Sequence, residues 1–115
     1  MTILACMCNQ PQRLAEALTP LRASLVTPGP VARWGLGYVQ GGEILLSRTP
    51  RRSEAPLDFF PPIAALTSDC LIGHAAHDNV ELGPEGTQPV RFRRWMMAQC
   101  SRCNLSHPVC FSMNW

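Results

Sequence analysis

The segment CLIGHAAHDN, residues 70–79, places two histidines and an aspartate directly behind a short apolar run. Histidine and carboxylate side chains are common proton donors and acceptors in enzymes, so this segment is the first candidate for chemistry. His77 and Asp78 are adjacent, however, and adjacent side chains of an extended strand point to opposite faces. We therefore expect a surface or structural role for both residues rather than a catalytic pair.

A second group of reactive side chains lies near the C-terminal end, in residues 100–110. Its four zinc-type ligands are Cys100, Cys103, His107 and Cys110. Thiolates and imidazole suit tetrahedral zinc, but the spacing is tighter than that of a zinc knuckle, and Pro108 restricts the backbone at His107. A small zinc-binding interaction module is therefore an alternative, while the main interpretation includes no metal and no cofactor.

The elements that position these residues follow from hydrophobic periodicity. Residues 3–8 are apolar and suit a short buried strand. Residues 11–26 carry leucine and alanine at three- and four-residue steps, which predicts an amphipathic helix with a kink at Pro20. The stretch WGLGYVQGGEILLSR, residues 34–48, predicts a β-hairpin. Its strands are expected at 34–39 and 43–47, with the turn at 40–42.

The remainder of the chain predicts shorter elements. A helical piece is expected at 63–66 and a strand at 69–74, joined to the hairpin by a proline-rich connection. Residues 81–89 are a predicted loop, and residues 90–99 a predicted final strand. This order gives an α+β fold with mostly antiparallel strands, and 115 residues suffice for one domain.

Composition narrows the function classes. The formal charge is +2, and every basic residue is an arginine. Because the arginines are scattered, nucleic acid is not an expected partner. No apolar run approaches the roughly 18 residues that span a bilayer, and no basic region precedes the N-terminal apolar segment. We therefore expect a cytoplasmic protein without a membrane partner, whose six cysteines are buried or free thiols.

The N-terminal strand, RWGLGYVQGGEILLSRTP (33–50), LIGHAAHDN (71–79) and TQPVRFRRWMMAQ (87–99) together resemble the class II glutamine amidotransferases, in their compact bacterial form. The resemblance covers residues 1–99. It implies part of an αββα N-terminal-nucleophile hydrolase sandwich, with glutamine as the bound molecule. In that family the first residue of the mature chain attacks the side-chain amide of glutamine, and its own α-amine acts as general base.

The resemblance also assigns the catalytic positions. Thr2 occupies the nucleophile position, where active members carry cysteine, and an active N-terminal threonine hydrolase is a further alternative. Cys100 stands where the family has its oxyanion asparagine, and thus supplies no comparable donor. We expect catalysis to be impaired.

The substrate-binding positions are altered as well. His74 and Ala76 match the His-x-Arg segment whose arginine clamps the α-carboxylate of glutamine, and a methyl group cannot hold a carboxylate. Trp34 and Gly35 are retained, and are most simply interpreted as packing residues.

The tail, residues 100–115, diverges from the family and has no clear strand or helix period. The chain is therefore identified as a truncated or degenerate member of the family. A sandwich that lacks much of one sheet leaves apolar side chains uncovered, which favours self-association. The side chains expected on that uncovered face are Leu45, Ile72, Phe92 and Trp95.

Overall fold

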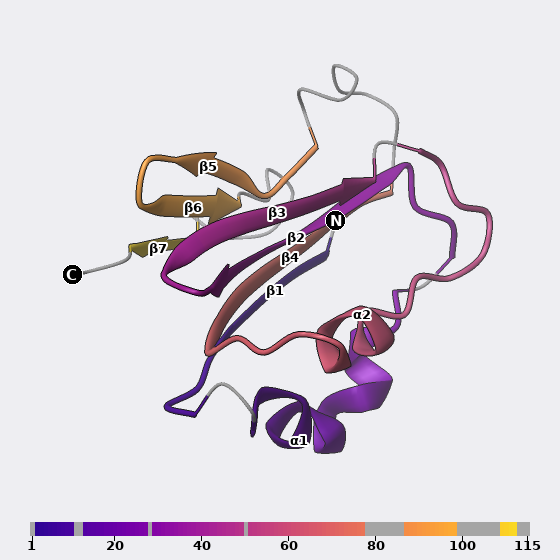
Figure 1. Ribbon diagram of the computed structural model, residues 1–115. Helices are drawn as coiled ribbons and strands as arrows, with labels where there is room; N and C mark the ends of the chain where they lie inside the picture. The colour runs from indigo at the N-terminus through magenta and orange to yellow at the C-terminus, as the bar shows by residue number, and fades with distance from the viewer. Residues whose placement is uncertain are drawn as a thin grey trace.

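The computed structural model describes residues 2–10, 13–27, 29–49, 51–77, 87–98 and the backbone of 109–112. Short helices and two antiparallel sheets make up this part of the chain, so the predicted α+β class is confirmed (Figure 1). The first sheet has the order β1-β4-β2-β3, formed by β1 (Thr2–Met7), β2 (Arg33–Gln40), β3 (Glu43–Thr49) and β4 (Cys70–Ala76). The second has the order β5-β6-β7, formed by β5 (Val90–Phe92), β6 (Trp95–Ala98) and β7 (Val109–Ser112).

The β2–β3 hairpin forms where the sequence predicts it. Gly41 and Gly42 make the two-residue turn with φ values of 61° and 76°. A turn with positive φ at both positions matches the right-handed twist of the flanking strands. Glycine and a few polar residues adopt this conformation at a low steric cost. The register then pairs Gln40 with Glu43 and continues to Trp34 opposite Thr49.

The predicted helix over residues 11–26 is interrupted. An α-helical turn, α1 (Leu14–Leu18), passes into the 3₁₀ helix η2 (Thr19–Leu25). Pro20 has no N–H, and its ring crowds the carbonyl one turn earlier, so the α-helical bond pattern stops there. The expected kink is thus a change of helix type.

The second helix, α2 (Phe60–Ala64), begins three residues before the predicted 63–66 piece. Asp58 Oδ1 accepts the backbone N–H of Phe60 at 2.9 Å. Pro61 and Pro62 follow within the first turn, where a missing N–H breaks no helical hydrogen bond.

The prediction of one final strand over residues 90–99 is wrong. These residues form the β5–β6 hairpin, which turns at Arg93 and Arg94. Arg93 has a φ of 54°, a conformation that a bulky residue seldom adopts. β7 pairs with β6 further along, so the tail contains a strand that its composition does not predict.

Apolar side chains pack on both faces of the first sheet. Helices α1 and α2 lie on one side of it, while the β5–β6 hairpin lies on the other (Figure 1). The helix-side core includes Leu14, Leu18, Leu25, Leu36, Phe59, Ile63, Leu71 and Ala75. The hairpin-side core includes Ile44, Cys70, Ile72, Met96 and Ala98.

The expected uncovered face is therefore only partly present. Ile72 is 0% exposed, because the β5–β6 hairpin covers the centre of the sheet, and its assignment to an uncovered face is wrong. Leu45, Phe92 and Trp95 are exposed, Phe92 to 66%, but they do not share one face. Leu45 lies on the helix side of the first sheet, whereas Phe92 and Trp95 lie in the second sheet.

Candidate functional site

The side chain of Thr2 meets His77 at the N-terminal end of β1. Thr2 lies opposite Ala75 in the β1–β4 register, so His77 follows as its diagonal neighbour just beyond β4. Side chains at such diagonal positions share a face of the sheet and lie within reach of each other. Thr2 Oγ1 and His77 Nε2 are 3.2 Å apart, in a half-buried hydrogen bond.

The other ring nitrogen of His77 determines which partner donates. His77 Nδ1 lies 3.2 Å from the carbonyl oxygen of Pro30. A carbonyl oxygen can only accept, so Nδ1 carries the proton of that bond. In the neutral imidazole Nε2 is then an acceptor, and the Thr2 hydroxyl donates to it. A hydroxyl, an imidazole and a group that orients the imidazole form the arrangement of an activated nucleophile.

Two of the family-derived substrate positions, His74 and Ala76, lie on the other face of the sheet from Thr2. His74 is one residue before Ala75 in β4, and Gly35 is its cross-strand partner. Because side chains alternate along a strand, His74 and Ala76 face the hairpin side, whereas Thr2 faces the helix side. His74 and Ala76 are buried, at 1% and 0% exposure. The structure therefore does not bring the nucleophile position and the clamp position to one face.

An arginine does lie beside the clamp position. Arg33 is the cross-strand partner of Ala76 in the β2–β4 register. Its side chain is buried at 5% exposure and is not open to solvent. Sequence reasoning missed this neighbour, because it depends on a register between segments more than 40 positions apart.

Trp34 and Gly35 have structural roles in this fold. The Trp34 ring packs edge-on against Phe59, with 6.0 Å between ring centroids, and belongs to the helix-side core. A Cβ atom at Gly35 would collide with the backbone carbonyl oxygen of Gln88. Glycine at this position thus lets the segment before β5 approach β2.

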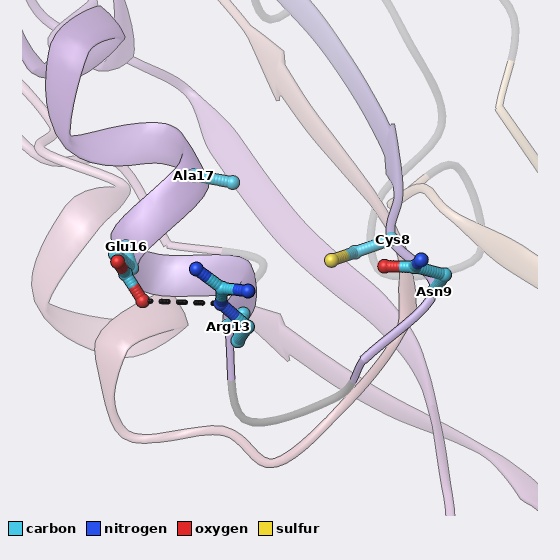
Figure 2. A pocket seen from close by; sticks show the side chains of 5 residues that line it. All are labelled: Cys8, Asn9, Arg13, Glu16 and Ala17. Carbon is cyan, nitrogen blue, oxygen red and sulfur yellow. Dashed lines mark hydrogen bonds and ion pairs between the residues drawn. The ribbon is translucent and has the colours of Figure 1, made fainter.

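A shallow pocket of about 270 Å³ lies at the opposite end of β1 (Figure 2). Its lining residues are Cys8, Asn9, Arg13, Glu16 and Ala17. Arg13 Nε and Glu16 Oε2 form an exposed ion pair at 3.4 Å, and the Cys8 thiol donates to the carbonyl oxygen of Gln10 at 3.3 Å. An exposed ion pair of this kind stabilises little and remains screened by solvent, so the pocket presents no concentrated charge.

The partly buried thiols are poor nucleophiles. Burial raises the pKa of the Cys6 thiol above its ordinary value of 9.0, and the neighbouring Cys8 adds to the shift. Burial likewise raises the pKa of Cys70 from 9.0 to about 11, with further contributions from Asp69 and Cys6. Because only the thiolate attacks electrophiles or binds metals, Cys6 and Cys70 are inert near neutral pH.

Several predicted site residues lie outside the described residues. These are Asp78, Cys100, Cys103 and His107, and of Cys110 the structure describes only the backbone, in β7. Within the described ranges no three His, Cys, Asp or Glu side chains are grouped in a way that could hold a metal ion. The tail zinc site stays a prediction.

No family model, curated protein or solved structure matches the chain. Among the helices that the structure describes, none combines the length and apolar character required to cross a bilayer.

Proposed function

We propose that the chain is a class II glutamine amidotransferase-like domain, built as part of an αββα sandwich, that does not hydrolyse glutamine. One observation carries this proposal. β1 begins at the nucleophile position, Thr2, and pairs with β4, the strand that carries the GHAAH segment. The two segments that resemble the catalytic machinery of the family are therefore neighbours, although the reactive groups on both are replaced.

The first loss concerns recognition of the substrate carboxylate. A bidentate arginine–carboxylate pair consists of charge-assisted hydrogen bonds worth about 1.5–3 kcal/mol each. Alanine at position 76 removes both, which weakens glutamine binding by about 3 kcal/mol or more, roughly a hundredfold. Arg33 does not replace the clamp, because its side chain is buried on the face opposite Thr2.

The second loss concerns the reaction itself. A threonine hydroxyl is a far weaker nucleophile near neutral pH than a cysteine thiolate. Removal of one oxyanion-hole donor slows acyl transfer by about 10²–10³-fold, and the residue at that position of the family is Cys100 here. Together these losses leave no useful rate of amide hydrolysis.

A glutaminase assay on the full chain tests the proposal. The wild type and the Thr2→Cys variant are incubated with L-glutamine, and ammonia release is measured against buffer and against Thr2→Ala. We expect no release from any of them, because restoring the thiol does not restore the clamp. Release from the wild type that Thr2→Ala abolishes would overturn the proposal. Release from Thr2→Cys that Arg33→Ala abolishes would show that Arg33 serves as the clamp.

Cys6, Cys8 and Cys70 are free thiols, which fits the reducing cytoplasm, the compartment we propose.

A further inference from the structure

We propose that Thr2 and His77 form a nucleophile–base pair that is acylated by activated esters of short carboxylic acids. This reaction does not rest on the amidotransferase assignment, since neither the glutamine clamp nor the family's α-amine base takes part in it. Its site is the end of β1 on the helix side of the sheet, where the two side chains are half-buried and meet at 3.2 Å.

The imidazole is held in the form that can accept a proton. Pro30 C=O accepts from Nδ1 at 3.2 Å, which directs the lone pair of Nε2 toward the Thr2 hydroxyl. The contact distance lies at the upper end of the range for a working nucleophile and base, which is usual for a site without bound substrate. His77 contacts the reacting hydroxyl directly, and Pro30 acts only through His77.

The proposed step moves one proton and exchanges one bond. Thr2 Oγ1 attacks the ester carbonyl carbon while its proton passes to His77 Nε2. The bond to the leaving oxygen then breaks, and the protonated imidazole returns the proton to that oxygen, which leaves as the free alcohol or phenol. Water afterwards attacks the acyl-threonine ester, with Nε2 again taking the proton. The bond to Thr2 Oγ1 then breaks, the imidazolium returns the proton to Oγ1, and the carboxylic acid leaves. The sum is ester plus water to acid plus alcohol.

The leaving group determines the substrate class. A phenol oxygen is a far better leaving group than an amine, so an aryl ester needs less stabilisation from the protein to acylate Thr2 than an amide does. The pair is therefore suited to aryl or similarly activated esters rather than amides. The methyl group on Cβ of Thr2 crowds the attacking oxygen, which favours small acyl groups such as acetyl.

The base distinguishes this mechanism from that of the family. An N-terminal nucleophile that uses its own α-amine loses activity when the amine is blocked or the chain is extended. With His77 as the base, a free amine at Thr2 is not required. Two chains are compared, one that carries an additional Gly-Ser pair before Met1 and one that begins at Thr2 after removal of Met1. We expect their acylation rates to agree within about threefold.

The experiment uses p-nitrophenyl acetate with the full chain, after the thiols have been blocked with iodoacetamide. Release of p-nitrophenolate gives the acylation rate, and peptide mass spectrometry locates the acetyl group. We expect acetylation at Thr2, retained in Thr2→Ser and lost in Thr2→Val. We expect His77→Gln to slow it by about 10²-fold or more.

Thr19→Ala is the matched control. The Thr19 hydroxyl also makes one intramolecular bond, to the Ala15 carbonyl oxygen at 2.9 Å, but has no imidazole beside it. Its loss should leave the rate unchanged. Circular dichroism of each variant separates a chemical effect from unfolding, and His77→Gln preserves a hydrogen-bonding side chain for this purpose. Acetyl groups found elsewhere, with a rate insensitive to Thr2→Val, would overturn the proposal, as would an unchanged acylation rate in His77→Gln.

Discussion

Replacing Ile72 by alanine tests whether the second sheet covers the first. Ile72 lies in the central strand β4, is 0% exposed and packs within the core that includes Met96 of β6. The substitution removes roughly three methylene equivalents at about 0.8 kcal/mol each, or about 2.4 kcal/mol. The cavity left behind raises the expected loss of unfolding free energy to about 3–4 kcal/mol.

This loss is large enough to measure by thermal or urea denaturation. For 115 residues the unfolding entropy is about 0.24 kcal/mol/K, so 3 kcal/mol lowers the Tm by about 12 °C. Leu45→Ala is the matched control, because Leu45 is 36% exposed on β3, the edge strand of the same sheet. We expect it to cost about 1 kcal/mol. If both variants lost the same small amount, the face carrying Ile72 would be uncovered and the packing described above would be wrong.

A double-mutant cycle sharpens the test. Ile72 and Met96 belong to one buried cluster, so the effects of Ile72→Ala and Met96→Ala should not add. A coupling energy of about 0.5–3 kcal/mol is typical for residues in contact. Additivity within about 0.3 kcal/mol would indicate that β6 and β4 are not packed together in solution.

Four further outcomes are expected. Gly35→Ala should lower the unfolding free energy by about 1–3 kcal/mol in urea titrations, because its Cβ collides with the carbonyl of Gln88; an unchanged midpoint would contradict that close approach. The folded state keeps the Cys70 proton to about pH 11, whereas the unfolded chain releases it near pH 9.0, so stability should fall between these values. Cys70→Ala should flatten that part of the stability curve, and a curve identical to wild type would exclude the thiol as its cause. Purified protein should carry substoichiometric zinc after dialysis, and Cys103→Ser should leave the melting curve unchanged; one tightly held equivalent lost on that substitution would favour the zinc module. Phe92→Ser should reduce self-association in light scattering, since this side chain is 66% exposed, and a wild type that is already monomeric would refute the association.

Local signals in the sequence predict the elements that form locally. The β2–β3 hairpin can be predicted from the sequence, because two glycines at the turn remove the steric penalty of positive φ. The β5–β6 turn cannot be predicted in this way, because an arginine adopts the positive φ and neither glycine nor asparagine occurs at the turn. At Pro20 the sequence indicates a break but not its form, because a kinked α-helix and a 3₁₀ continuation both accommodate the missing N–H.

The candidate site depends on strand register, which the sequence does not specify by itself. Thr2 and His77 are 75 positions apart, and only the pairing of Thr2 with Ala75 brings them together. A shift of that register by one residue would turn His77 to the other face from Thr2. The adjacency of His77 and Asp78 indicated a structural role, whereas the contact with Thr2 becomes visible only in the folded chain.

The position of β1 at the edge of the sheet has a consequence for the order of folding. β2 and β3 meet across a two-residue turn, so their loop closes on the microsecond timescale. β1 must instead pair with β4, which lies more than 60 residues further along the chain. Closing this long loop costs more conformational entropy than closing the hairpin, and the loss precedes the contacts that offset it. β1 also pairs on one side alone, whereas β4 is held by β1 and β2. In native-state hydrogen exchange the amides of β1 should therefore open at a lower free energy than those of β2. Because Thr2 opens this edge strand, we expect the hydroxyl–imidazole pair to form after the β2–β3 hairpin and to be lost when the edge frays.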